Sequence, residues 1–157
     1  MRVSEPPGPH VEPIDPDVDL HVPGQAGELA RPVPVLASIA AGGVLGTLSR
    51  YGLQVAFPHA VTGFGWATFA INVSGCFLLG VLMVLITHRW PHRRLLRPFL
   101  GVGVLGGFTT FSAYAVDIDQ AILAGAVGTA LAYLLATVVA ALAAVWAGST
   151  VARRLAA

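Results

Sequence analysis

The chain has 157 residues, of which 55% are hydrophobic and 11% are charged, and its mean hydropathy is +0.74. Soluble domains carry about 25% charged residues, so this composition excludes an ordinary soluble domain and indicates a single-domain integral membrane protein. The net charge of +1 indicates no nucleic-acid partner, and Cys76, the only cysteine, excludes an intrachain disulfide. The sequence contains no nucleotide-binding loop, paired-histidine metal motif or nucleophile elbow, so no enzymatic activity is expected.

Residues 1–32 are predicted to form a disordered, acidic tail. They hold seven of the eleven prolines and six of the eight acidic residues. Such a segment cannot bury enough apolar surface to offset the entropy that ordering costs. It also lacks the basic start and apolar centre of a secretory signal peptide. We therefore expect a tail that precedes one membrane domain over residues 33–157.

Four apolar segments follow, at residues 34–57, 66–87, 95–116 and 121–151. Each has about 20 residues or more, which is enough to cross a ~30 Å hydrocarbon layer as an α-helix. The expected connections are residues 58–65, a basic turn at 88–94 and an acidic corner at 117–120. The glycine pairs Gly42-x-x-x-Gly46 and Gly103-x-x-x-Gly107 predict close backbone packing on the first and third segments. The sequence thus predicts an all-α membrane protein with four transmembrane helices.

The arginines predict how these helices are oriented. Four crossings place both termini and the 88–94 turn on one side of the membrane, which then carries eight of the nine arginines. The other side has only Arg50. Because basic residues concentrate in cytoplasmic loops, both termini are expected in the cytoplasm of a cell-membrane protein.

The third segment carries glycines and hydroxyls where lipid would penalise them, in the run from Gly106 to Tyr114. Polar side chains and loosened backbone are tolerated at membrane depth only where they are buried in protein or line a wet path. Phe111 and Tyr114, three residues apart, share a helix face. They either pack against other helices or direct their partly positive ring edges toward an anion. Hydroxyls are supplied beside the glycines by Thr109, Thr110 and Ser112.

The other segments add polar groups at similar depth. The Asn72 carboxamide either bonds a neighbouring helix or offers its two N–H donors to an anion. Arg50 either extends to lipid phosphate or attracts anions into a vestibule. Tyr133 and Thr137, four residues apart, place two hydroxyls on one face of the fourth segment. If the helices converge, these groups form a polar track.

In combination, these motifs resemble the CrcB/Fluc fluoride channels. The matching residues are Gly42-Gly43-x-x-Gly46-x-x-x-Arg50-Tyr51, Asn72-x-x-Gly75-Cys76-Phe77-x-x-Gly80 and Gly106-Gly107-Phe108-Thr109-Thr110-Phe111-Ser112, in order and at the family spacing across residues 35–151. The resemblance implies a dual-topology dimer, in which two antiparallel four-helix subunits enclose two narrow fluoride pores. It also implies a third helix that is broken at the membrane centre. There the carbonyls of Gly106 and Thr109 would hold a structural Na⁺ at the dimer interface.

The resemblance also implies roles for the remaining site residues. Asn72 would be the pore asparagine and Arg50 the basic vestibule residue. The pore aromatics would be Phe111 and Tyr114, and the pore-lining hydroxyls those of Ser112, Tyr133 and Thr137. Tyr114 stands where the family commonly has phenylalanine, so this position carries an added phenol. The strong arginine bias departs from a homodimer inserted both ways round, and it predicts pairing with a related, oppositely oriented subunit.

Two other functions are compatible with four short membrane helices. A proton-coupled multidrug exporter needs a membrane-embedded carboxylate, but segments 34–57, 66–87 and 121–151 contain no Asp or Glu. A non-conducting membrane assembly factor would explain the acidic tail but not the polar residues at mid-membrane. A passive fluoride pore explains those residues and needs no catalytic group.

Overall fold

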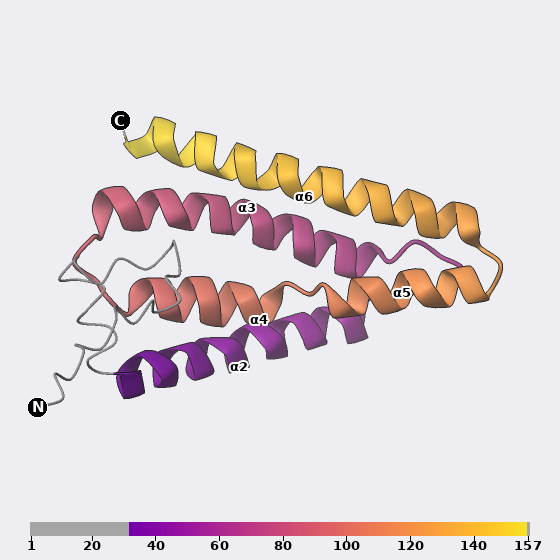
Figure 1. Ribbon diagram of the computed structural model, residues 1–157, viewed down its shortest axis with the longest axis horizontal. Coiled ribbons are helices and arrows are strands. Elements are labelled where there is room, and N and C mark those ends of the chain that lie inside the picture. Colours follow the sequence, from indigo (N-terminus) through magenta and orange to yellow (C-terminus); the bar gives the residue numbers. More distant parts are fainter. Residues whose placement is uncertain (1–31, 157) are drawn as a thin grey trace, which may run out of the picture. The chain divides into compact units, whose positions relative to one another are not determined.

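The computed structural model describes residues 32–156, within which all regular secondary structure is helical. The elements in chain order are α2 (Pro32–Ala56), α3 (Trp66–Arg89), the π-helix η1 (Arg97–Leu105), α4 (Gly106–Phe108), α5 (Ser112–Leu123) and α6 (Val127–Ala156) (Figure 1). Four stretches are long and apolar enough to cross a membrane: Pro32–Ala56, Trp66–Arg89, Arg97–Leu123 and Val127–Leu155. The prediction of an all-α chain with four such helical stretches is confirmed. The predicted tail lies outside the described residues, except for Pro32, which begins α2.

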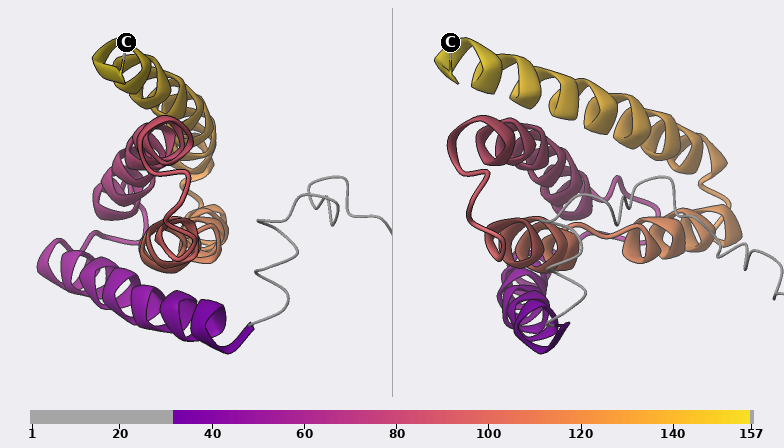
Figure 2. Two further views of the ribbon diagram at one scale, coloured as in Figure 1. Left: turned by 90° about the vertical axis from the view of Figure 1, so that its left-hand side faces the viewer. Right: turned by 60° about the vertical axis from the view of Figure 1, so that its left-hand side comes forward.

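Glycines bring α2 into backbone contact with the third stretch (Figure 2). A methyl group added at Gly42 would collide with the Phe99 carbonyl oxygen and would lie 2.9 Å from the Val104 nitrogen. On the surface of η1 that faces α2, a methyl group at Gly103 would lie 2.8 Å from the Ile39 carbonyl oxygen. The glycine pairs on the first and third segments therefore permit the close packing that their spacing predicted.

The α3–α6 contact uses the same device, and Figure 1 shows the two helices side by side. A methyl group added at Gly80 of α3 would collide with the Val145 carbonyl oxygen of α6. One added at Gly148 of α6 would collide with the Phe77 carbonyl oxygen of α3. In both helix pairs, α2 with the third stretch and α3 with α6, glycines allow the backbones to approach closely. This close approach fixes the positions of the polar groups on these helices.

The turn between the third and fourth stretches lies later than predicted. The expected corner at residues 117–120 is wrong, because this segment belongs to α5, which continues to Leu123. The chain turns instead at Gly125, whose φ is +79°. The Gly125 N–H donates to the Ile122 carbonyl (2.9 Å) and the Ala126 N–H to the Ala121 carbonyl (2.8 Å), the paired bonds of a Schellman motif. Glycine tolerates the left-handed conformation that this motif requires.

The third stretch changes its helical register before it loses helical structure. In the π-helix η1, main-chain N–H groups donate to the carbonyls five residues earlier. At its end, the Gly106 N–H donates to the Gly101 carbonyl. Helical structure continues through α4 to Phe108, after which Thr109 is extended, with φ −74° and ψ 155°. It resumes at Ser112, so residues 109–111 form a non-helical connection within one membrane-length stretch (Figure 1).

Candidate functional site

The non-helical connection places five consecutive carbonyls, those of residues 106–110, outside the ordinary helical pattern. The Gly107 carbonyl accepts from Arg50 Nε (3.1 Å) and from Thr47 Oγ1 (3.4 Å). The Thr110 carbonyl accepts from Asn72 Nδ2 (2.9 Å). No donor among residues 32–156 lies within hydrogen-bonding range of the remaining three, the carbonyls of Gly106, Phe108 and Thr109. Gly106 is exposed and Phe108 and Thr109 are half-buried, so these three carbonyls are accessible to a ligand or to another chain.

Asn72 on α3 holds the connection in place. Asn72 is 9% exposed, and its carboxamide forms two hydrogen bonds with the main chain of Thr110. Asn72 Nδ2 donates to the Thr110 carbonyl, and the Thr110 N–H donates to Asn72 Oδ1 over 2.8 Å. The helix–helix hydrogen bond considered from the sequence is therefore present. One of the two N–H groups on Nδ2 is committed to it, and the other has no protein acceptor among the described residues.

Arg50 also reaches the connection rather than extending only toward lipid. Because its Nε donates to the Gly107 carbonyl, the guanidinium lies at the end of α4. The contact joins α2 to the third stretch one turn beyond the backbone contact at Gly46. A positive charge is thereby fixed next to the unpaired carbonyls.

The two candidate pore aromatics lie next to each other but differ in exposure. The ring centroids of Phe111 and Tyr114 are 5.8 Å apart, although Phe111 precedes α5 and so does not share a helix face with Tyr114. Phe111 is 79% exposed, whereas Tyr114 is 5% exposed and packs edge-on against Tyr133. The phenol of Tyr114 donates to the Leu134 carbonyl on α6 (2.8 Å). The added hydroxyl is thus used to attach α5 to α6.

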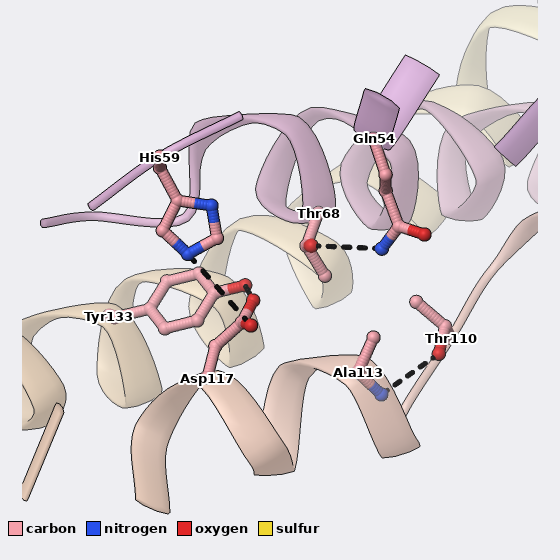
Figure 3. A network of polar contacts seen from close by, with 7 residues as sticks. All are labelled: Gln54, His59, Thr68, Thr110, Ala113, Asp117 and Tyr133. Carbon is pink, nitrogen blue, oxygen red and sulfur yellow. Dashed lines mark hydrogen bonds and ion pairs between the residues drawn. The ribbon is translucent and has the colours of Figure 1, made fainter. Parts of the chain in front are cut away.

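Tyr133 and Thr137 are both buried, at 2% and 5% exposure, and lie one turn apart on α6. Figure 3 shows the Tyr133 phenol directed at Asp117, to whose Oδ2 it donates over 3.3 Å. His59, from the connection between α2 and α3, approaches the same carboxylate with its Nε2 3.8 Å from Oδ1. The Thr137 hydroxyl is buried and has no hydrogen-bond partner within residues 32–156.

Ser112 begins α5 and is exposed, with its hydroxyl 3.4 Å from that of Thr110. The Thr110 hydroxyl in turn accepts from the Ala113 N–H (3.1 Å; Figure 3), as the capping side chain of a helix does. Asn72, Thr110 and Ser112 are therefore adjacent, and Tyr114 is adjacent to Tyr133. The structure thus brings Asn72, Thr110 and Ser112 together in one group and Tyr114 and Tyr133 in another.

Three contributors were not identified as site residues from the sequence. In the sequence Thr110 is one hydroxyl among several, although its place three residues after the Gly106-Gly107 pair could have suggested a helix cap. Asp117 was placed at a corner, yet it bonds Tyr133. His59 lies in a connection without any repeating pattern, so no sequence signal places it beside Asp117.

Comparisons with known proteins agree with the motifs. The model of the family described as "CrcB-like protein, Camphor Resistance (CrcB)" matches residues 37–149. A relative in Streptomyces avermitilis, named fluoride-specific ion channel FluC 2, is 49% identical over 131 residues, which cover 82% of this chain and 83% of the relative. A FluC 1 from Streptomyces coelicolor is 51% identical, covering 78% of this chain and 79% of the relative. A FluC 2 from Nocardia farcinica is 53% identical, covering 76% and 85%.

Proposed function

Because the chain belongs to the CrcB-like family, as its motifs predicted, we propose that it is a passive channel through which fluoride leaves the cytoplasm. Its four apolar helical stretches and its family make it a multi-pass membrane protein. The observation that carries the proposal is the non-helical connection at residues 109–111, held by Asn72 inside a membrane-length stretch. Structure of this kind is too costly to expose to lipid, so it is either buried in protein or lines a path for an ion, and the family favours the second.

The conducting unit is a dimer of antiparallel subunits with two pores. A single chain leaves Phe111, next to the polar connection, 79% exposed. The unpaired carbonyls of residues 106, 108 and 109 also need protein or ions around them in a bilayer. A partner subunit packed against this region would cover both the Phe111 side chain and these carbonyls. The third helix, on this reading, is interrupted near the membrane centre.

Fluoride would pass along weak donors that replace its water one contact at a time. The free N–H of Asn72, the Ser112 hydroxyl and the ring edges of Phe111 and Tyr114 line one part of the path. The hydroxyls of Tyr133 and Thr137 line the other. Of these, the Thr137 hydroxyl has no competing partner. Weak, multiple contacts let the ion enter and leave, whereas a fixed cation in the pore would trap it.

A structural Na⁺ at the dimer interface fits the donor set. The carbonyls of Gly106 and Thr109 are among those that accept no hydrogen bond within residues 32–156. In the same range, His, Cys, Asp and Glu form no group of three that could hold a metal ion, so a cation would bind main-chain oxygens. Hard cations such as Na⁺ suit oxygen ligands. The ion would compensate the carbonyl dipoles that the interruption leaves unpaired.

The arginine bias supports a single orientation, with both termini in the cytoplasm. An antiparallel dimer would then need a related subunit inserted the other way. Streptomyces avermitilis has relatives named FluC 2 and FluC 3, so one organism can hold more than one such chain. Expressing this chain alone and labelling it from each side of the membrane tests the idea. Conducting dimers that contain both orientations of this one chain would refute it.

Arg50 would attract anions to the mouth of the path, and the membrane potential would drive them. An inside-negative potential expels an anion with about 2.3 kcal/mol per charge for each 100 mV, so no second energy source is required. The rival exporter mechanism needs an embedded carboxylate. The nearest one, Asp117, lies at the level of the α2–α3 connection, because it pairs with His59. That places it close to the membrane surface.

Fluoride efflux from liposomes tests the proposal. The parent protein, with any paralogous subunit it requires, should release fluoride much faster than chloride. Phe111→Ile should slow this flux at least about tenfold while leaving the dimer intact, because it removes a ring edge from the path. Phe57→Ile is the matched control, since Phe57 is also exposed (64%) but lies at the end of α2. Equal fluxes from the two variants would mean that Phe111 only packs.

A further inference from the structure

We propose that Asn72 and Thr110 are positioning residues that create the cation site, because they keep the carbonyls of Gly106 and Thr109 free of hydrogen bonds. The inference rests on the proposed cation-stabilised channel and assigns its assembly to two side chains. Neither side chain ligates the ion in this account. Each acts by taking a main-chain donor that a helix would give to a ligating carbonyl.

Asn72 diverts the first donor. In an uninterrupted α-helix, the Thr110 N–H would donate to the carbonyl four residues earlier, that of Gly106. Here it donates to Asn72 Oδ1 over 2.8 Å, and Asn72 Nδ2 occupies the Thr110 carbonyl over 2.9 Å. The carboxamide therefore replaces both helical partners of one residue, at its N–H and at its carbonyl. The Gly106 carbonyl is left unpaired as a direct consequence.

The Thr110 side chain diverts the second donor. The Ala113 N–H would donate to the carbonyl of Thr109 in a continuous helix. It donates instead to Thr110 Oγ1 over 3.1 Å, which caps the start of α5. The Thr109 carbonyl, held by the extended backbone of its own residue, is thereby released as well. One residue thus supplies its N–H to Asn72 and its hydroxyl to Ala113.

The burial of both residues makes this arrangement hard to replace. Asn72 is 9% exposed and Thr110 is 8% exposed, so water cannot readily substitute for either side chain. If Asn72 is removed, the Thr110 N–H has the Gly106 carbonyl as its nearest ordinary acceptor. Closing that bond restores the helix and consumes a cation ligand. The side chain proposed as the pore asparagine therefore also controls whether the cation can bind.

The test is a Na⁺ titration of the purified dimer, followed by its thermal stability, with N-methyl-D-glucamine as the replacing cation. The variants are Asn72→Ala, Asn72→Asp, Thr110→Val and Thr110→Ser. Thr110→Ser keeps the capping hydroxyl, and Asn72→Asp keeps an acceptor for the Thr110 N–H but loses the donor. Ser74→Ala is the control, because Ser74 is exposed on the same helix and bonds only within it.

We expect the parent, Ser74→Ala and Thr110→Ser to share one half-saturating Na⁺ concentration. It should rise roughly five- to tenfold in Asn72→Ala and Thr110→Val, which each lose one diverted hydrogen bond, because that is the usual worth of one such bond. Asn72→Asp, which keeps the acceptor for the Thr110 N–H, should titrate with the parent. A parent whose stability ignores Na⁺ would overturn both the cation assignment and this inference. A Na⁺-dependent parent with Asn72→Ala and Thr110→Val titrating like Ser74→Ala would overturn the inference alone, even if their fluoride flux fell.

Discussion

Replacing Gly46 with alanine should separate α2 from the third stretch. A methyl group there would lie 2.8 Å from the Phe108 nitrogen and would collide with the Val104 carbonyl oxygen, whereas ordinary contacts of this kind lie at 3.4–4 Å. Both obstacles are main-chain atoms, so no side-chain rotation can relieve the overlap. The helix must move by about 1 Å, since that is the size of the overlap.

The magnitude follows from two terms. Overpacking of a close contact costs roughly 1–3 kcal/mol. The same shift would lengthen the Arg50 Nε to Gly107 carbonyl bond, now 3.1 Å, beyond bonding range. That charge-assisted bond adds about 1.5–3 kcal/mol, while alanine returns about 1 kcal/mol of helix propensity. The net loss of unfolding free energy is therefore about 3 kcal/mol, which corresponds to a fall in melting temperature on the order of 10 °C.

Thermal unfolding in detergent micelles, followed by tryptophan fluorescence, measures this loss. Gly52→Ala is the matched control, because it changes the same helix where an added methyl group meets nothing within 4 Å. It should unfold at the parent temperature or slightly above. If Gly46→Ala and Gly52→Ala had the same melting temperature, the reasoning from backbone contact would be refuted.

Three further predictions concern the turn, the buried hydroxyl and the tethering arginine. Gly125→Ala should lower the unfolding free energy by about 1–2 kcal/mol, because its φ is +79°, whereas Gly128→Ala in the open first turn of α6 should raise it slightly; melting curves of the two variants that coincide would contradict this. Thr137→Val removes a buried hydroxyl without a partner, so stability should hold or rise by up to ~1 kcal/mol while fluoride efflux falls; unchanged efflux would exclude Thr137 from the path. Arg50→Gln should slow efflux by about tenfold or more and Arg50→Lys by less, because lysine keeps the charge but not the guanidinium that bonds Gly107; equal rates in the parent and both variants would rule out a role for Arg50.

The architecture was predictable because lipid imposes a strong constraint on composition. Stretches of about 20 apolar residues can only be helices, so four of them were visible from hydropathy alone. The glycine pairs at 42/46 and 103/107 were also informative, since small residues four apart indicate backbone contact whatever the partner. What they did not indicate was which helix meets which, because spacing carries no information about the partner.

The end of the third stretch was mispredicted for a physical reason. Asp117 and Asp119 suggested a polar corner, yet the helix continues past them. The Asp117 carboxylate is compensated by the Tyr133 hydroxyl and by His59, so it can remain on a helix near the membrane surface. The actual turn depends on Gly125, whose φ is left-handed, and local composition did not distinguish it from the other glycines.

The candidate site was predictable as a set of residues but not as a set of bonds. The unusual polarity of residues 106–114 and the mid-segment position of Asn72 pointed to the region where the structure has its non-helical connection. The hydrogen bonds depend on backbone geometry that no sequence periodicity encodes, such as the π-helical conformation of η1 and the extended conformation of Thr109. The two hydrogen bonds between the Asn72 carboxamide and the main chain of Thr110 form only when α3 and the third stretch are brought together.

The interlocked glycines also limit which motions the subunit can make. Sliding α2 by one turn would carry Arg50 into the slot that Gly46 now occupies, where main-chain atoms leave no room even for a methyl group. Rotation of α2 about its axis by about 100° would drive Leu45 or Thr47 into the same slot. The first helix and the third are therefore expected to travel as one rigid block. Rearrangements that accompany each ion's transit should be confined to side-chain rotamers, and the open passage would need no piston or rocking step.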